Sequence, residues 1–392
     1  MNCRLPMRYL AALWLFLIAV PGLAETPRWE FSLEKGGLQS FDRQATAVWM
    51  KQQGVLFLTP EWVLVYQVNR TARQAELGQR GASGGAGNFF LSLKVLSAQD
   101  GRVIKSMNLP TSASLSHVLA TRGGSFLVRT GNMLYLYSPA FEQLAARELP
   151  LAKEAPNEDW QVRVSPVGEK VVLFHEQVFT TAEILPDNSV LHDGKAKVDV
   201  LILNAETLAQ ERAFTLSHTL PFWAPGDEVL ISSNPAHSYT DGQVGTLNFN
   251  GEWSPLTANF LLDRTFCRYN MTTASEERVV LLGCETFTVM SMTGERLYSR
   301  HDARYVFVSA LAAGSYLAVQ CDRYRMEQIG LSGGASLGTR VDRIEVFDLD
   351  TRQRRLSVPI RGDVAYYAVS PQGALAIVDG GILHVYAVDS HH

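Results

Sequence analysis

The sequence predicts an all-β fold in which small sheets of similar design repeat along the chain. A tight turn recurs before an apolar strand, as in Ser165–Gly168 (Ser-Pro-Val-Gly) before Val171–Phe174 and Ser370–Gly373 (Ser-Pro-Gln-Gly) before Leu375–Val378. Short apolar runs bounded by Gly, Pro, Asn and Asp are typical of strands joined by turns. Repetition of such a unit indicates one array of like sheets rather than several unrelated domains.

Each repeating unit is expected to hold four strands, a to d, in chain order. In the first unit these are Ala47–Met50, Val55–Leu58, Phe90–Leu96 and Val103–Leu109, with a long insertion between b and c. Further strands are predicted at His117, Ser125–Val128, Met133–Tyr137, Gln161–Val164, Val171–Phe174, Val198–Leu203, Arg212–Leu216, Val229–Ile231, Val279–Leu282, Tyr316–Val319, Tyr366–Val369, Leu375–Val378 and Leu383–Val388, with third strands of units four to six ending at Phe249, Met290 and Phe347.

The seventh unit supplies only three strands, and an unassigned strand near the other end of the chain completes it. Trp29–Leu33 alternates apolar and polar residues and belongs to no other unit. Pairing it with the last unit closes the array into a ring and removes the exposed sheet edges of an open stack. The sequence therefore predicts a seven-bladed β-propeller closed by an N-terminal strand, with six or eight blades as the alternatives.

The repeating phrases resemble those of a known propeller superfamily. The Ser-Pro-x-Gly turn and Val346–Thr351 (Val-Phe-Asp-Leu-Asp-Thr) are similar to the WD40-like, YVTN and quinoprotein-like propellers. The Trp-Asp dipeptide of WD40 repeats and the regular tryptophan pattern of quinoprotein blades are absent from the chain. The resemblance implies the architecture, which serves enzymes, ligand binders and assembly scaffolds alike.

The first residues predict export. Arg4 and Arg8 precede an apolar run, Tyr9–Val20, and Gly22–Ala24 supplies small residues for cleavage. The run is shorter than the roughly 20 residues of a membrane span. We expect residues 1–24 to be a signal peptide and residues 25–392 to form one propeller domain, periplasmic or extracellular, with no stable membrane insertion after cleavage.

The net charge limits the expected partners, and the cysteine content limits the possible disulfides. The formal net charge is −4, and cleavage would remove two arginines and no acids, giving −6. Without a basic stripe, nucleic acid is not an expected partner. Three cysteines follow the signal, and Cys267 and Cys284, which lie in consecutive strands of one unit, are the candidate disulfide. The competing pair is Cys284 with Cys321. In the remaining alternative all three thiols are reduced.

Two features point to where a ligand would bind. Three long polar insertions, Gln74–Asn88, Val178–Lys197 and Met326–Thr339, all occupy the b–c position and should emerge on one face. Polar side chains also recur where b strands end, at the expected mouth of the central channel. The candidate ligand-binding residues there are His175, Glu176, Asn234, Glu285, Asp322, Arg323 and Asp379.

These features favour a non-catalytic scaffold that binds a protein or peptide through the b–c loop face. The alternative is a lactonase-like hydrolase or small-molecule binder that holds a divalent cation at the channel mouth, for which Glu176 and Asp322 are candidate ligands. Two G-x-S-x-G matches, Gly81–Gly85 and Gly330–Gly334, lie in glycine-rich insertions rather than on a strand-to-helix turn, where a nucleophilic serine would need to lie. We therefore expect no organic cofactor and no catalytic residue.

Overall fold

The structure is a computed structural model of the chain. The structure describes residues 25–38, 53–70, 89–111, 116–150, 160–165, 168–177, 182–184, 190–192, 197–217, 221–223, 229–233, 244–248, 252–255, 270–275, 278–282, 285–291, 293–329, 334–361 and 366–388. The predicted signal peptide, the strand Ala47–Met50, Asn234, Cys267 and Cys284 lie outside these residues.

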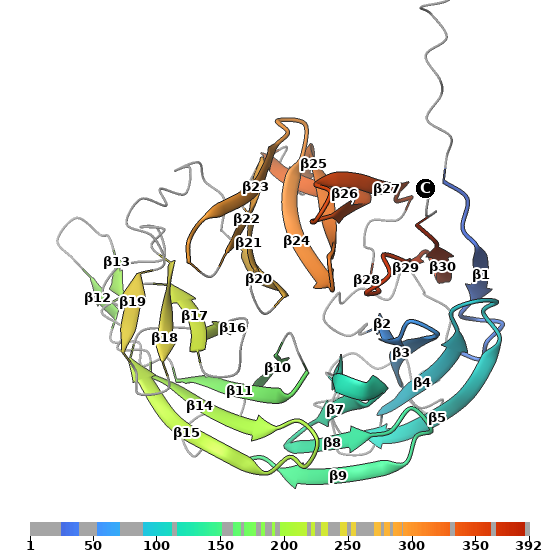
Figure 1. Ribbon diagram of the computed structural model, residues 1–392, viewed down its shortest axis with the longest axis horizontal. Coiled ribbons are helices and arrows are strands. Elements are labelled where there is room, and N and C mark those ends of the chain that lie inside the picture. The colour runs from blue at the N-terminus through green and yellow to red at the C-terminus, as the bar shows by residue number, and fades with distance from the viewer. Residues whose placement is uncertain are drawn as a thin grey trace, which may run out of the picture.

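The described residues form seven four-stranded antiparallel sheets arranged as the blades of a ring (Figure 1). Within each blade, strands that follow one another in the chain are paired, apart from the insertion of β12 and β13 in blade 3 and the return of β1 to blade 7. Blades 1 to 3 are β2 (Gln53–Thr59), β3 (Trp62–Arg70), β4 (Phe89–Ser97) and β5 (Val103–Thr111); β6 (Ser116–Ala120), β7 (Phe126–Thr130), β8 (Met133–Tyr137) and β9 (Gln143–Glu148); and β10 (Gln161–Val164), β11 (Lys170–Gln177), β14 (Lys197–Asn204) and β15 (Gln210–Ser217).

The second half of the ring follows the same design. Among the described residues, the one helical turn is the 3₁₀ helix η2 (Arg122–Gly124) in blade 2, and no helix is long and apolar enough to cross a membrane. Blades 4 to 7 are β16 (Pro221–Trp223), β17 (Val229–Ser233), β18 (Val244–Asn248) and β19 (Trp253–Pro255); β20 (Asn270–Ser275), β21 (Arg278–Leu282), β22 (Thr286–Ser291) and β23 (Arg296–His301); β24 (Val306–Ala313), β25 (Tyr316–Ile329), β26 (Gly334–Asp348) and β27 (Gln353–Pro359); and β28 (Tyr366–Val369), β29 (Leu375–Asp379), β30 (Ile382–Tyr386) and β1 (Trp29–Ser32).

The predicted propeller and its closing strand are confirmed. β1 pairs antiparallel with β30, from Trp29 opposite Val385 to Ser32 opposite Ile382. The Trp29 indole nitrogen donates a hydrogen bond to the carbonyl oxygen of Ala98 in blade 1, 2.9 Å away. The strand thus belongs to the last blade while its tryptophan contacts the first, and this joins the two ends of the fold.

The prediction for blade 1 was wrong in detail. Val55–Leu58, predicted as strand b, belongs to the innermost strand β2. Strand b is instead β3, Trp62–Arg70, which follows the turn at Pro60-Glu61 and was predicted to be part of the insertion. β3 pairs with β2 and β4, so the insertion still lies between strands b and c.

The recurring turn has a physical explanation. The Ser165 hydroxyl oxygen accepts hydrogen bonds from the backbone N–H groups of Glu169 and Lys170, and the Ser370 hydroxyl accepts from Gln372 and Ala374. The glycine that ends each turn has a positive φ, +77° at Gly168 and +85° at Gly373, which favours glycine. A Cβ at Gly168 would lie 2.5 Å from the backbone nitrogen of Arg122 in blade 2, so this turn also fixes how closely two blades pack.

The hydrophobic core lies between neighbouring blades. Phe287, Phe307 and Phe347 meet between blades 5 and 6, each 3% exposed or less. Leu33 and Leu38 join the core between blades 7 and 1. Burial of one strand face against each neighbouring blade is what holds a propeller together, because a single four-stranded sheet cannot cover its own apolar faces.

Two of the predicted polar insertions contain paired strands. Most of Met326–Thr339 continues strands b and c of blade 6, since β25 and β26 stay paired from Tyr316 opposite Asp348 as far as Ile329 opposite Gly334. Within Val178–Lys197, the strands β12 (Ala182–Ile184) and β13 (Val190–His192) form a small two-stranded sheet. We call residues 324–329 of β25 and 334–339 of β26 the blade 6 ribbon.

Candidate functional site

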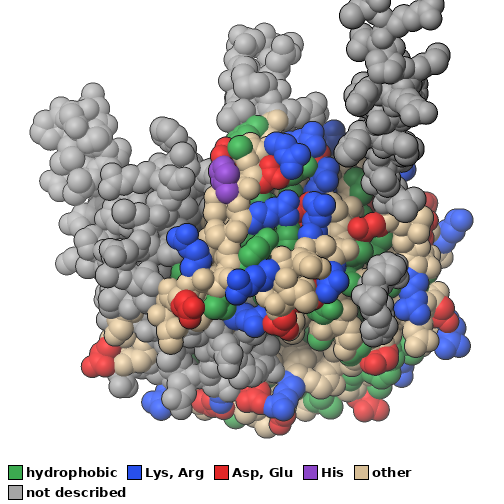
Figure 2. Space-filling view, turned by 45° about the horizontal axis from the view of Figure 1, so that its top comes forward, with side chains coloured by type: hydrophobic (Ala, Val, Ile, Leu, Met, Phe, Trp, Pro, Cys, Tyr) green, Lys and Arg blue, Asp and Glu red, His purple; other side chains and the backbone are tan. Residues whose placement is uncertain are grey.

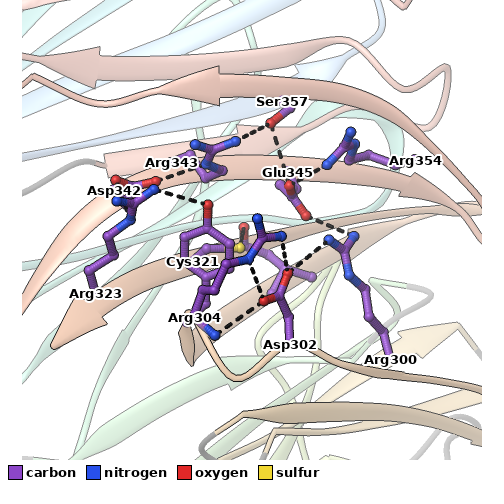
Figure 3. Close-up of polar contacts among 12 residues, drawn as sticks. Arg300, Asp302, Arg304, Cys321, Arg323, Asp342, Arg343, Glu345, Arg354 and Ser357 are labelled. Carbon is purple, nitrogen blue, oxygen red and sulfur yellow. Dashed lines mark hydrogen bonds and ion pairs between the residues drawn. The ribbon is translucent and has the colours of Figure 1, made fainter. Parts of the chain in front are cut away.

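A cluster of arginines and carboxylates lies between blades 5 and 6 (Figure 3). Its members come from the end of β23, the β23–β24 connection and the three outer strands of blade 6. We define this arginine cluster as Arg300, Asp302, Arg304, Tyr305, Arg323, Asp342, Arg343, Glu345 and Arg354.

Strand alternation places Arg343 and Glu345 on one side of the blade 6 sheet. In β26, Ile344 and Val346 are buried in the core toward blade 7. Arg343 and Glu345 alternate with them and face blade 5, where Phe347 packs in the core between blades 5 and 6. An apolar strand therefore presents charged groups on a side that the next blade only partly covers.

Each carboxylate of the cluster is shared by two arginines. Asp302 accepts Nε and Nη2 of Arg304 at 2.9 and 2.7 Å, and Arg300 lies 3.7 Å away. The two oxygens of Asp342 contact Nε of Arg323 at 3.0 Å and Nε of Arg343 at 2.8 Å.

Glu345 occupies the buried centre of the cluster. Only 1% of it is exposed, and its oxygens contact Nη1 of Arg300 at 2.9 Å and Nη1 of Arg354 at 2.8 Å. The Ser357 hydroxyl adds a weaker hydrogen bond at 3.4 Å. Two guanidinium groups on one carboxylate compensate the cost of burying its charge.

Tyr305 forms an aromatic surface for three of the guanidinium groups. Its ring is buried, and the guanidinium carbons of Arg304, Arg323 and Arg343 lie 5.4–5.5 Å from the ring centroid. Arg323 also donates to the Tyr305 hydroxyl at 3.4 Å. Cation–π contacts of this length orient arginines that would otherwise sample many rotamers.

The electrostatics of the cluster follow from these contacts. Hydrogen bonds from Arg304 hold the pKa of Asp302 well below its usual range, and the same pair raises the pKa of Arg304. Asp302 is therefore expected to be charged at neutral pH. Burial raises the pKa of the nearby Cys321 thiol, so this cysteine is protonated and weakly nucleophilic.

Part of the cluster reaches solvent. The side chains of Arg304, Arg323 and Arg354 are 74%, 55% and 48% exposed, whereas Asp302 and Glu345 are nearly covered. Figure 2, in which the top of the ring comes forward, shows Lys and Arg side chains gathered over the region of blade 6. Five arginines face three carboxylates, so the cluster carries an excess of two positive charges.

Of the seven predicted ligand-binding residues, Arg323 belongs to this cluster and Asp322 adjoins it in β25. Asp322 is 4% exposed and accepts a hydrogen bond from the Gln320 amide at 2.8 Å. Glu285 lies beside His301, with 4.0 Å between Oε2 and Nε2. Asp379 accepts the backbone N–H of Arg361 at 3.0 Å.

Two of the other predicted residues, His175 and Glu176, lie in blade 3. His175 is 2% exposed near the end of β11, with its ring centroid 5.5 Å from that of Trp160. Glu176 follows it in the same strand, and its side chain, like Asn234, lies outside the described residues. A shared ligand site for the seven residues stays a prediction.

The predicted cysteine pairing also stays a prediction, because Cys267 and Cys284 lie outside the described residues. The third cysteine, Cys321, is a buried free thiol. Within the described part of the chain, no three His, Cys, Asp or Glu side chains are grouped as metal ligands.

A cavity of about 700 Å³ lies along the central channel. The described innermost strands β2, β6, β10, β24 and β28 line it together with the a–b turns of several blades. Of the seven predicted ligand-binding residues, the lining contains none.

Sequence reasoning missed most of the arginine cluster. Arg304-Tyr305 was predicted to start an a strand, among the polar residues expected around the channel mouth, but not to join a cluster with blade 6. A signal was present in Arg340–Val346 (Arg-Val-Asp-Arg-Ile-Glu-Val), where charges alternate with β-branched residues although neighbouring c strands are mostly apolar. The partners on β23 could not be inferred, because the alternation of residues within one strand does not show how one blade packs on another.

No protein-family model and no curated protein matches this chain. Solved structures do match it over nearly its whole length. A chain of the mitotic checkpoint complex is similar at 10% identity and a TM-score of 0.51, covering 99% of this chain and 96% of that one. This chain is a β-propeller.

Two further matches are weaker in geometry. The β-propeller domain of Cps50 (Swd1) from Myceliophteria thermophila has 7% identity and a TM-score of 0.49, over 86% of this propeller and 96% of that domain. BamB from Moraxella catarrhalis has 15% identity and a TM-score of 0.37, over 86% and 83%. At such identities the comparisons concern the fold and not a function.

Proposed function

We propose that this propeller is an exported, non-catalytic scaffold that binds a protein or peptide partner through the face carrying its b–c connections. The observation that carries the proposal is the blade 6 ribbon. Beyond Arg323 opposite Arg340, its strands stay paired for six further residue pairs. At about 3.3 Å per residue this adds roughly 20 Å of paired backbone next to the arginine cluster.

The position of the insertions supports a binding face. The segments 71–88 and 178–196 connect strands b and c of blades 1 and 3, at the same position in the unit as the ribbon in blade 6. In an antiparallel blade, b–c connections and the connections between successive blades lie at the same ends of the strands. Asp302, Arg304 and Tyr305 belong to such a connection, between β23 and β24. Binding residues concentrate on connections held by a rigid sheet.

Export rests on the sequence of residues 1–24, with its basic start, apolar run and small residues before Glu25. The match to a chain of the mitotic checkpoint complex concerns the fold alone, so the proposal rests on the surface of this chain.

The test uses residues 25–392 fused to a purification tag at the C-terminus. Cross-linking in envelope and secreted fractions, followed by mass spectrometry, should recover a defined protein in near-stoichiometric amount. Replacing Met326–Leu337 by a short Gly-Asn turn should reduce this recovery about tenfold or more, because it removes the ribbon but leaves the rest of blade 6 paired.

A matched control disturbs the opposite ends of the blades. A Gly-Ser insertion at Thr293-Gly294, in the turn between β22 and β23, should leave recovery unchanged. If the ribbon variant recovers as much partner as the unaltered chain, the proposed face is wrong. If the unaltered chain recovers no specific protein, the proposed function is wrong. Export is tested separately with the full chain, by N-terminal sequencing of the mature protein; retention of residues 1–24 would refute it.

A further inference from the structure

We propose that the arginine cluster is the docking site for an extended acidic segment of a partner protein, whose Asp and Glu carboxylates bind Arg304, Arg323 and Arg354. This inference rests on the proposed function, because it names the chemistry of the partner segment. It is carried by the exposure, charge and anchoring of these three side chains.

The three arginines combine solvent exposure with fixed positions. Each is about half exposed or more, yet each is anchored to a carboxylate on its covered side: Arg304 to Asp302, Arg323 to Asp342 and Arg354 to Glu345. Arg304 and Arg323 also lie over the same Tyr305 ring. Ligand binding to such preoriented groups costs less side-chain entropy than binding to free surface arginines.

The local charge opposes the charge of the whole chain. The chain has a net charge of −4, whereas the cluster has an excess of two positive charges. Arg340, which pairs with Arg323 next to the ribbon, and Arg361 are exposed beside the cluster, and Arg340 donates to the Arg361 carbonyl at 3.0 Å. A positive surface on an acidic protein favours an anionic partner.

The spacing of the arginines favours a polymer over a single anion. The three guanidinium groups are held by three different carboxylates, and Figure 3 shows Arg323 and Arg354 at opposite ends of the group. Successive carboxylates of an extended peptide match guanidinium groups that separate carboxylates hold in this way. The planar fork of arginine matches a carboxylate by two parallel hydrogen bonds.

The ribbon favours a peptide over a lipid surface. It continues for six residue pairs past Arg323 on the face that carries the cluster. A flat bilayer would meet this projecting backbone before it reached the arginines, whereas a peptide strand can lie beside it. Arginine is also enriched among the residues that dominate the binding energy of protein interfaces.

The experiment measures binding of a short fluorescein-labelled peptide rich in Asp and Glu to residues 25–392 by fluorescence anisotropy. The reference peptide has the same length with Asn and Gln at those positions. We expect the acidic peptide to bind about tenfold or more tightly than its amide counterpart, and its affinity to fall as salt rises.

The variant R304Q/R323Q/R354Q should weaken the acidic peptide about tenfold or more. The control R102Q/K105Q/R296Q removes the same charge at exposed positions in blade 1 and at the far end of β23, and should change affinity less than about twofold. If the first variant does not fold, R304K/R323K/R354K replaces it. Lysine keeps the charge without the planar fork, so this variant should also bind more weakly.

Several results would overturn the inference. Absence of preference for the acidic peptide would do so, as would equal losses in the two triple variants or full affinity of the lysine variant. Inorganic phosphate that competes better than acetate at equal ionic strength would assign the cluster to a phosphate ligand. Stronger, arginine-dependent binding to phosphatidylglycerol vesicles would assign it to a membrane.

This outcome is separable from that of the proposed function. If the natural partner is recovered equally by R304Q/R323Q/R354Q, the scaffold stands and the acidic docking site is wrong. If no partner is recovered by the unaltered chain although the acidic peptide binds, the arginine site stands without the proposed scaffold role.

Discussion

At the scale of single residues, Glu345 determines the geometry of the arginine cluster. Its buried carboxylate contacts Arg300 from blade 5 and Arg354 from blade 6, so it joins two strands of different sheets. Arg300 also lies 5.0 Å above the Phe347 ring, which is part of the core between these blades. Removal of the charge at Glu345 would leave Arg354 without its carboxylate partner and Arg300 with only the more distant Asp302.

We therefore predict that Glu345→Gln lowers the free energy of unfolding by about 2 to 3 kcal/mol. The expected value is below that for a fully buried pair, because Arg354 is 48% exposed and retains much of its hydration. Urea unfolding followed by tryptophan fluorescence measures this change. The matched control Glu211→Gln removes the partner of Lys170 on the surface of blade 3 and should cost less than about 1 kcal/mol. Equal effects of the two variants would contradict the role of Glu345.

The candidate site was only partly predictable at this scale. Arg323 was identified because it follows an apolar b strand, at a position where polar groups face the channel or the loop surface. Arg300, Glu345 and Arg354 were not, since the alternation of charge in β26 and β27 does not reveal which blade lies opposite. Their grouping depends on the packing of blade 6 on blade 5.

At the scale of elements, the strands were predicted well and their positions in the blades less well. β10 and β28 match the predicted Gln161–Val164 and Tyr366–Val369 residue for residue. β3 was missed because Pro60-Glu61 makes a turn short enough to place the whole of Trp62–Arg70 in a hairpin with β2. The ribbon was missed because backbone pairing continues through a polar, glycine-rich segment that carries no apolar alternation.

The recurring turn offers a prediction at this scale. Gly168→Ala should lower the free energy of unfolding by more than about 2 kcal/mol, because the residue has a positive φ and its Cβ would meet the backbone of Arg122 in the neighbouring blade. Gly123→Ala is the matched control, since Gly123 has φ +71° but no atom within 4 Å of its Cβ position. The control should cost about 1 kcal/mol, from backbone strain alone. Chemical unfolding of both variants measures the difference, and equal costs would show that the contact between blades does not matter.

At the scale of the whole molecule, one strand decides whether the sheets form a closed ring. β1 pairs with β30 over four residue pairs, and Leu33, 2% exposed, continues into the core between blades 7 and 1. Without β1, β30 would become an edge strand with unpaired backbone groups, and blades 1 and 7 would lose the contact made by Trp29. Closure is therefore a property of the entire chain and not of either blade alone.

Deletion of Trp29–Leu33 from residues 25–392 should thus lower the melting temperature by roughly 10 °C or more and promote aggregation through the exposed edge. Removal of Asp389–His392, which follows the last described residue, is the control at the other terminus and should leave the melting temperature nearly unchanged. Differential scanning fluorimetry with light scattering measures both properties.

A synthetic peptide of residues 25–38 added to the deletion variant should restore part of the lost stability, since it can pair with β30 in trans, whereas a peptide with Trp29 and Leu33 replaced by Ser should not. Melting of the deletion variant at the temperature of the intact chain would show that the ring does not depend on this strand.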